Sequence, residues 1–286
     1  MRYRICALSL LLLVQLTAAG QTTQNKDAQK PVRAPLPQQG VKFDEESFIK
    51  AVIEGKEDVV NQLLAAGINP NVKDSDGTTA LFHAIWKGHK KIVLALIARG
   101  ADVNQKVESD APLRVAAGCG NVEIVEALLA KGAQVDIKDD GGHTPLLVAM
   151  FGTGLSSAPE AFVRQFLSGD QIKSCLDTKD GHEKIVKLLV ERGANVSVRA
   201  SDGGETPLFV AALFGNTEMV KFLLAHHVKV NDKTWQDRTA LKWIESLRLL
   251  PNDPEIRNDQ VMMDWLRSTS GKHAEIIQLL RQAGAK

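Results

Sequence analysis

The sequence predicts an all-α solenoid of about six stacked helix-turn-helix units, with helical inserts in two of them. Two observations lead to this prediction. One pattern of apolar residues and glycines recurs along the chain, with Gly67, Gly100 and Gly132 spaced 33 and 32 residues apart. The composition is that of a folded protein, since 44% of the 286 residues are apolar and 24% are charged.

The second helix of each unit is the clearest part of the repeat. An Ile-Val pair, followed by further apolar residues, recurs in the segments Gly88–Gly100, Gly120–Gly132 and Gly181–Gly193. This spacing puts the apolar side chains on one stripe of a helix. The glycine that closes each segment supplies the left-handed conformation that ends a helix.

In four of the units the first helix begins at a Thr-Pro-Leu or Thr-Ala-Leu sequence. In Thr144-Pro145 and Thr206-Pro207, the threonine is suited to be the N-cap and the proline to take the first helical position. A turn with Asp and Gly precedes it. Such a unit cannot bury its own apolar face, so neighbouring units must stack.

These motifs resemble the ankyrin-repeat family. They are Asp-Asp-Gly-Gly-His-Thr-Pro-Leu at 139–146, Ser-Asp-Gly-Gly-Glu-Thr-Pro-Leu-Phe-Val-Ala-Ala at 201–212, and Gly-His at 88–89 and 181–182. The resemblance covers about residues 42–286. It implies an ankyrin-repeat solenoid that binds other proteins, although one such fold serves many partners. It also implies a structural role at the inter-helix turns for His89, His182 and, near the equivalent turn, His273.

Two units are longer than the repeat. The inserts, at about 153–180 and 245–269, fall between the first and second helix of their units. We expect one helix to begin near Ser157 and end near Gly169, and another to begin near Asp253, with Val261, Met262, Trp265 and Leu266 on its apolar face. These helices either pack on the edge of the array or form an added surface for a partner.

The segment before the repeats has two parts. Residues 1–20 have the layout of a secretory signal peptide, with basic Arg2 and Arg4, a short apolar run and small residues at the end. Residues 21–40 are polar and proline-containing, which predicts a disordered linker to a repeat domain at 41–286. We therefore expect a periplasmic or secreted protein, bacterial in origin, with no membrane span after signal removal.

Composition argues against several kinds of site. The 35 Lys and Arg balance 34 Asp and Glu, which disfavours nucleic acid as a partner. No cofactor-binding, metal-binding or catalytic motif stands out, so we expect a protein that is not an enzyme and has no cofactor. We also expect a monomer. Cys119 and Cys175 follow the first helices of adjacent units, and in an oxidising compartment they form either a disulfide or two unpaired structural thiols.

The resemblance also indicates where a protein partner, of unknown identity, would bind. In ankyrin-like proteins, partners contact the hairpin tips and the exposed end of the first helix. Carried over to this sequence, the positions are Trp86, Lys87, His143, Phe151, Glu205, Leu213, Phe214, Trp235 and Arg238. The predicted function is an exported, non-catalytic protein-binding scaffold. The alternative is an enzyme or cofactor-binding protein that uses the two inserts.

Overall fold

The computed structural model describes residues 43–157, 179–201, 204–234, 237–250 and 259–286. Across these ranges the regular elements are twelve helices, together with isolated β-bridges at three hairpin tips. The predicted all-α class is therefore confirmed. The helix predicted from Ser157 to Gly169 and the helix start predicted at Asp253 lie almost wholly outside the described residues.

The described helices fall into two compact units. We call residues 43–116 and 121–134 the N-terminal unit, and residues 117–120 and 135–286 the C-terminal unit. The N-terminal unit holds α2 (Glu45–Ile53), α3 (Glu57–Ala65), α4 (Ala80–Trp86), α5 (Lys90–Ala98), most of α6 (Pro112–Gly118) and α7 (Val122–Ala130). The C-terminal unit holds α8 (Pro145–Ser157), α11 (Lys179–Glu191), α12 (Pro207–Leu213), α13 (Thr217–Ala225), α14 (Ala240–Leu247) and α16 (Gln260–Gln282).

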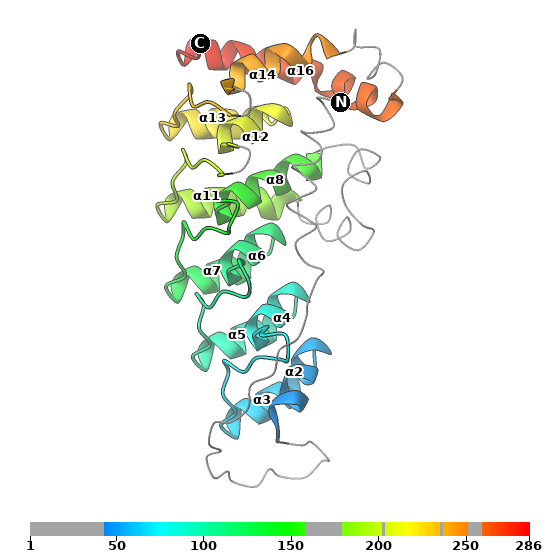
Figure 1. Ribbon diagram of the computed structural model, residues 1–286, viewed down its shortest axis with the longest axis vertical. Helices are drawn as coiled ribbons and strands as arrows, with labels where there is room; N and C mark the ends of the chain where they lie inside the picture. Colours follow the sequence, from blue (N-terminus) through cyan, green and yellow to red (C-terminus); the bar gives the residue numbers. More distant parts are fainter. Residues whose placement is uncertain (1–42, 158–178, 202–203, 235–236, 251–258) are drawn as a thin grey trace. The chain divides into compact units, whose positions relative to one another are not determined.

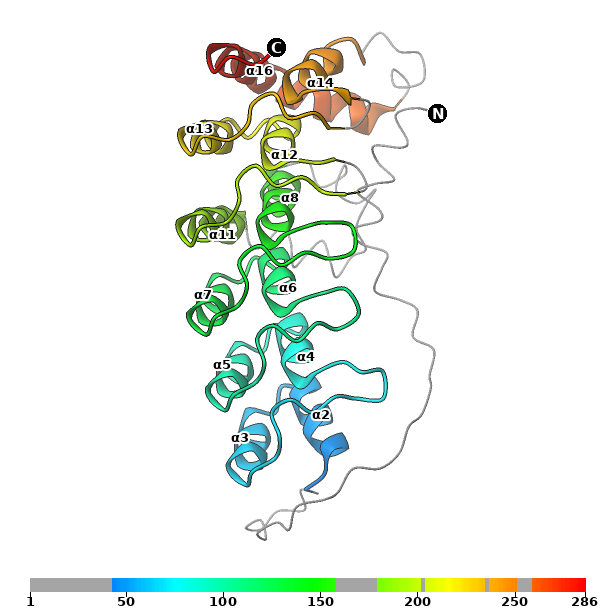
Figure 2. The same cartoon turned by 60° about the vertical axis from the view of Figure 1, so that its left-hand side comes forward.

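Each unit is a stack of helix pairs. In the N-terminal unit, α2 packs on α3 and α4 on α5, while α3, α5 and α7 form a row of second helices. In the C-terminal unit, α8 packs on both α11 and α12, and α14 packs on α16 (Figure 1). Figure 2 shows the loops that lead into the first helices projecting to one side of each stack. Side chains at a hairpin tip and on the helix that follows it are thus brought together.

The local signals in the sequence explain the helices of the uninterrupted repeats. In α5 the predicted stripe is buried, with Ile92, Val93 and Leu96 at most 1% exposed. The hydroxyl of Thr79 accepts the backbone N–H of Phe82 at 3.2 Å and caps α4, as its position predicted. Gly100, which closes α5, has a φ of 87°, a conformation that costs a residue with a Cβ free energy.

A ladder of polar side chains ties successive repeats together. Asn71 donates to the carbonyl of Gly100 at 3.3 Å and accepts the N–H of Asp102 at 2.7 Å. Asn104 repeats both contacts one unit on, with the carbonyl of Gly132 and the N–H of Gln134. Asn231 does the same in the C-terminal unit, with Gly284 and Lys286. The ladder satisfies the orphan carbonyl at each helix end.

The interrupted repeats differ from the sequence prediction at the start of their second helices. We expected turns at Gly181-His182 and near His273. Instead, α11 begins at Lys179 and includes His182, and α16 runs without a break over 23 residues through His273. In an uninterrupted repeat the chain must reverse at this place, and Gly88 does so with a φ of 72°. In the two repeats with inserts, these residues lie inside the second helix.

Candidate functional site

At three described hairpin tips, a carboxylate binds a basic side chain at or near the start of the helix that follows. In the N-terminal unit, Asp74 accepts the backbone N–H groups of Asp76 at 3.0 Å and Thr78 at 2.8 Å through Oδ1. Its second oxygen, Oδ2, lies 2.6 Å from Nε2 of His83 on α4. One carboxylate therefore shapes the turn and holds it against the first helix.

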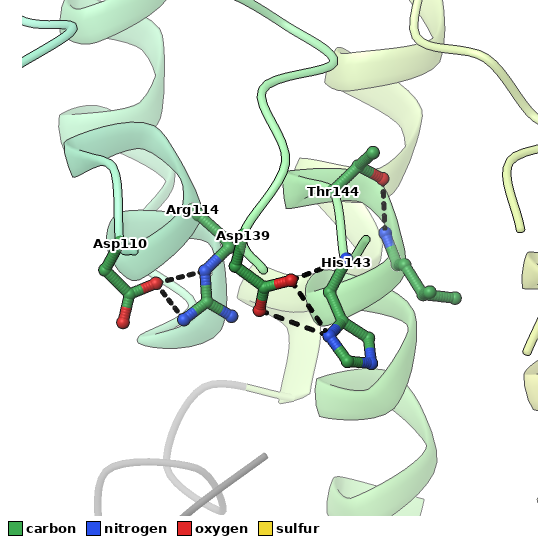
Figure 3. Close-up of polar contacts among 6 residues, drawn as sticks. Asp110, Arg114, Asp139, His143 and Thr144 are labelled. Atoms are coloured by element: carbon green, nitrogen blue, oxygen red, sulfur yellow. Dashed lines mark hydrogen bonds and ion pairs between the residues drawn. The ribbon is translucent and has the colours of Figure 1, made fainter. Parts of the chain in front are cut away.

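The same arrangement recurs at the tip before α8 (Figure 3). Asp139 accepts the backbone N–H of His143 at 2.8 Å, and both its oxygens lie 3.1 Å from Nδ1 of the His143 ring. The hydroxyl of Thr144 caps α8 by accepting the N–H of Leu147. His143, predicted to meet a partner, is thus largely engaged within its own tip, where 13% of its side chain is exposed.

The tip before α6 uses a different base for the same purpose. Asp110 contacts the guanidinium of Arg114, one turn along α6, in an ion pair whose side chains are largely buried (Figure 3). A carboxylate at the tip and a His or Arg near the start of the helix are the shared signal. These pairs do not form a sequence motif, because the spacing between the two partners differs from tip to tip.

The end of α4 carries the most exposed aromatic side chain of the described part of the chain. Trp86 is 51% exposed and packs edge-on against Phe82, whose ring centroid lies 6.1 Å away. Phe82 is itself in the core at 5% exposure, so it supports the indole from below. Lys87, the C-cap residue of α4, is exposed beside Trp86. Both residues are accessible, as their predicted role requires.

Three other predicted contact residues are inside the fold. Phe151, Phe214 and Glu205 are 6%, 3% and 2% exposed, so the prediction that their side chains are presented at the surface is wrong. Phe214 is covered because α8 continues to Ser157 and its Gly154 lies against the phenyl ring. Coverage of some of these rings by inserts or neighbouring repeats was the alternative to their exposure, and the start of an insert covers Phe214 in the next repeat.

Of the remaining predicted positions, some are partly exposed and others lie outside the described residues. Leu213 and Arg238 are partly exposed, and the Arg238 guanidinium lies over the ring of Trp243, 5.4 Å from its centroid. Trp235 and Cys175 lie outside the described residues. Cys119 is partly buried at the turn between α6 and α7, and its pairing with Cys175 stays a prediction.

Three histidines connect a second helix to the first helix of the preceding repeat. Nε2 of His89 lies 3.1 Å from the carbonyl of Ile53, that of His182 lies 3.0 Å from Gly118, and that of His273 lies 2.9 Å from Leu213. A carbonyl only accepts, so each Nε2 carries the proton. His89 makes its bond at the inter-helix turn, as predicted, whereas His182 and His273 make theirs from within α11 and α16. For His273, burial lowers the pKa, the carbonyl of Leu213 opposes that effect, and Lys272 adds to it.

The described ranges hold neither a metal-binding cluster nor a membrane-spanning helix. No group of three or more His, Cys, Asp or Glu side chains there is arranged to hold a metal ion. Among the same residues, no helix combines the length and apolar character needed to cross a membrane.

Comparison with known sequences decides the family. The model described as ankyrin repeats in three copies matches residues 31–107, the single ankyrin repeat matches 110–140, and the model of many copies matches 174–224. Together these matches cover more than half of the chain. The chain belongs to the ankyrin-repeat family. Ankyrin-repeat proteins are generally scaffolds for protein interactions.

Relatives of this ankyrin-repeat protein differ widely in name and size. An ankyrin repeat-containing protein of Treponema pallidum (strain Nichols) is 36% identical over 120 residues, 41% of this chain and 40% of the relative. The ankyrin repeat and KH domain-containing protein mask-1 of Caenorhabditis elegans is 28% identical over 227 residues, 72% of this chain and 8% of the relative. The E3 ubiquitin-protein ligase KEG of Arabidopsis thaliana is 25% identical over 180 residues, 62% and 10% respectively. This chain therefore matches less than half the length of each relative.

Proposed function

We propose that this ankyrin-repeat protein is an exported, non-catalytic scaffold that binds one protein partner through its hairpin tips and first helices. The observation that carries the proposal is the exposure of Trp86 at the end of α4. Tryptophan is enriched among the residues that contribute most to protein binding. A rigid, half-exposed indole on a helix loses little conformational entropy when a partner covers it.

The geometry of the first repeats supports this surface. The Asp74–His83 contact fixes the tip relative to α4, and Phe82 fixes the indole of Trp86. A partner would meet a surface that is already ordered before binding. Phe151, Phe214 and Glu205 are left out of the proposed surface because they are buried.

The proposed scaffold has no enzymatic activity of its own. The name of one relative includes a ligase activity, but the matching stretch is 10% of that relative, so the name does not carry over to this chain. A scaffold needs only a stable array with an accessible face, which the described helices provide.

Export is proposed from the first twenty residues. Arg2 and Arg4 precede an apolar run that is too short for a membrane span and is followed by small residues. We expect the mature protein in the periplasm or outside the cell. Fractionation of cells that make the full chain, with mass spectrometry of the mature N-terminus, tests this. An intact Met1 in the cytoplasm would contradict export.

Site-specific photo-crosslinking tests the scaffold. A photoreactive amino acid with an aromatic side chain, which keeps an aromatic ring at position 86, replaces Trp86 in one version of the chain and Leu94 in another, and both are expressed in the native host. Leu94 is the matched control, since it is 39% exposed and apolar but lies on α5, a second helix. We expect a protein adduct from position 86 and none from position 94. Equal adducts from both positions, or none from 86, would overturn the proposed surface.

A further inference from the structure

The chemistry of the partner follows from the charges around Trp86. The edge of the N-terminal unit where first helices turn into second helices carries several lysines. Lys56 lies 2.6 Å from a carboxylate oxygen of Glu54, and Lys91 lies 3.1 Å from one of Glu57. Lys90 pairs with Glu123. Each of these three ammonium groups therefore has its charge balanced by a carboxylate of this chain.

Lys87 lies on the same edge but differs from these three lysines in its ion pairing. It is exposed, and no carboxylate within the described part of the chain lies within ion-pair distance of its ammonium group. It follows Trp86 directly and caps the C-terminal end of α4. An unbalanced positive charge thus stands next to the most exposed aromatic ring of the described residues.

This combination selects among partner segments by chemistry. The indole face buries an apolar side chain, and the ammonium group needs a carboxylate within about 4 Å to form an ion pair. A charge without an ion-pair partner among the described residues steers a binding partner of opposite sign and penalises one of the same sign. A basic segment would therefore meet repulsion at Lys87.

We propose that the surface formed by Trp86 and Lys87 binds a protein segment in which an aspartate or glutamate stands beside an apolar side chain. The apolar side chain packs on Trp86, and the carboxylate pairs with Lys87. This inference rests on the proposed scaffold function and adds the chemical class of the partner to it. The group that pairs with Lys87 is thus the side-chain carboxylate of an aspartate or glutamate in another protein.

Selection from a random-peptide library displayed on phage tests the inference, with the full-length chain as bait. Baits are the wild type, Trp86→Ala, Lys87→Glu and Lys131→Glu. Lys131 is the matched control, because it is also an exposed C-cap lysine, on α7, without a described ion-pair partner. Circular dichroism and thermal melting verify that each bait is folded.

We expect the wild type and Lys131→Glu to enrich peptides with an acidic residue next to an apolar one. Trp86→Ala loses these peptides, and Lys87→Glu exchanges the acidic preference for Lys or Arg. A synthetic peptide of the enriched class binds Lys87→Glu about two- to tenfold more weakly than wild type. A gain of basic peptides by Lys87→Glu is an outcome that unfolding would not produce.

Other outcomes separate this inference from the function on which it rests. If the enriched peptides need Trp86 but carry no excess of acidic residues, the acidic-partner inference is overturned and the scaffold function stands. The same holds if Lys87→Glu enriches the same peptides as the wild type. The absence of enriched peptides, or enrichment that Trp86→Ala does not affect, overturns the binding surface itself. Sedimentation of the wild type adds a last criterion, since a dimer that Trp86→Ala dissolves would make a second copy the occupant.

Discussion

The C-terminal ends of α4 and α12 occupy the same place in their repeats but have opposite surroundings. At the end of α4, Trp86 is half-exposed and Lys87 lies in solvent. At the end of α12, the C-cap residue Phe214 is 3% exposed. Each end closes a first helix of seven residues, and both helices consist mostly of apolar residues. The C-cap residue is a lysine at one end and a phenylalanine at the other, and the burial of the phenylalanine requires neighbours that cover it.

The difference comes from the helices on either side. Gly154, in the part of α8 that extends beyond a normal first helix, lies against the ring of Phe214. On the other side, the backbone near Gly215 approaches Thr269 and Lys272 of α16. Both helices belong to repeats with inserts, whereas α4 lies among uninterrupted repeats. Lengthened helices bury one helix end and leave the other available for binding.

The largest expected effect is at the buried end. Phe214→Ala removes a buried ring and leaves a cavity between α8 and α12, which costs about 3–5 kcal/mol of unfolding free energy. Lys87→Ala, at the equivalent position of α4, changes stability by less than about 0.5 kcal/mol because its side chain is exposed. Urea unfolding measures both. Similar losses at the two positions would remove the contrast between the two ends.

A smaller effect tests the contact that covers Phe214. Gly154→Ala places a methyl group where it overlaps the Phe214 ring, and such overpacking costs about 1–3 kcal/mol. The cost falls when the ring is absent, so Gly154→Ala combined with Phe214→Ala destabilises less than the sum of the single changes. Additive losses in urea unfolding would show that the extension of α8 does not touch Phe214.

The pH dependence of stability tests the α16 side of the covered end. His273 is buried against the carbonyl of Leu213, and burial lowers its pKa below the ordinary value. The unfolded chain then binds a proton that the folded chain does not, so stability is complete above the unfolded pKa and falls as the pH drops below about 6.5. One proton gives a slope of at most about 1.4 kcal/mol per pH unit.

His273→Gln keeps a donor near the carbonyl of Leu213 and removes the titration. Unfolding free energies of both proteins are measured from pH 5 to pH 8, a range of roughly 1.5 units on either side of the histidine pKa of about 6.5. The wild type should lose more stability in acid than the variant. Parallel curves would mean that His273 takes up its proton equally in the folded and unfolded chain.

The smallest expected effect is at the open end. Trp86→Ala loses the edge-on contact with Phe82 and part of the indole's burial, a change of about 1 kcal/mol. Partner binding, by contrast, should be abolished. Thermal melting and the crosslinking yield from a neighbouring position separate the two results. A loss of stability as large as that of Phe214→Ala would mean that Trp86 is a core residue.

Much of the fold was predictable from sequence because its causes are local. Thr79 and Thr144 cap their helices within three residues, and the Ile92-Val93 pair faces the core at the expected helical spacing. The start of α11 was predicted wrongly, because Gly181-His182 has the same sequence as a turn pair but follows an insert. The exposure of Trp86 and Lys87 agrees with the sequence prediction, whereas Phe151, Phe214 and Glu205 are buried, and the binding role of the exposed residues stays a prediction.

The sequence by itself determined the repeat, its caps, its closing glycines and its family. Each of these depends on residues a few positions apart, which interact through one turn or one helix. The tertiary structure decided which aromatic ring meets solvent, which histidines are buried and which lysines of the described residues pair with a carboxylate. Gly154 and Phe214 are far apart along the chain, and so are Lys90 and Glu123. Exposure depends on what packs from another repeat, and that becomes known only when the helices are placed in space.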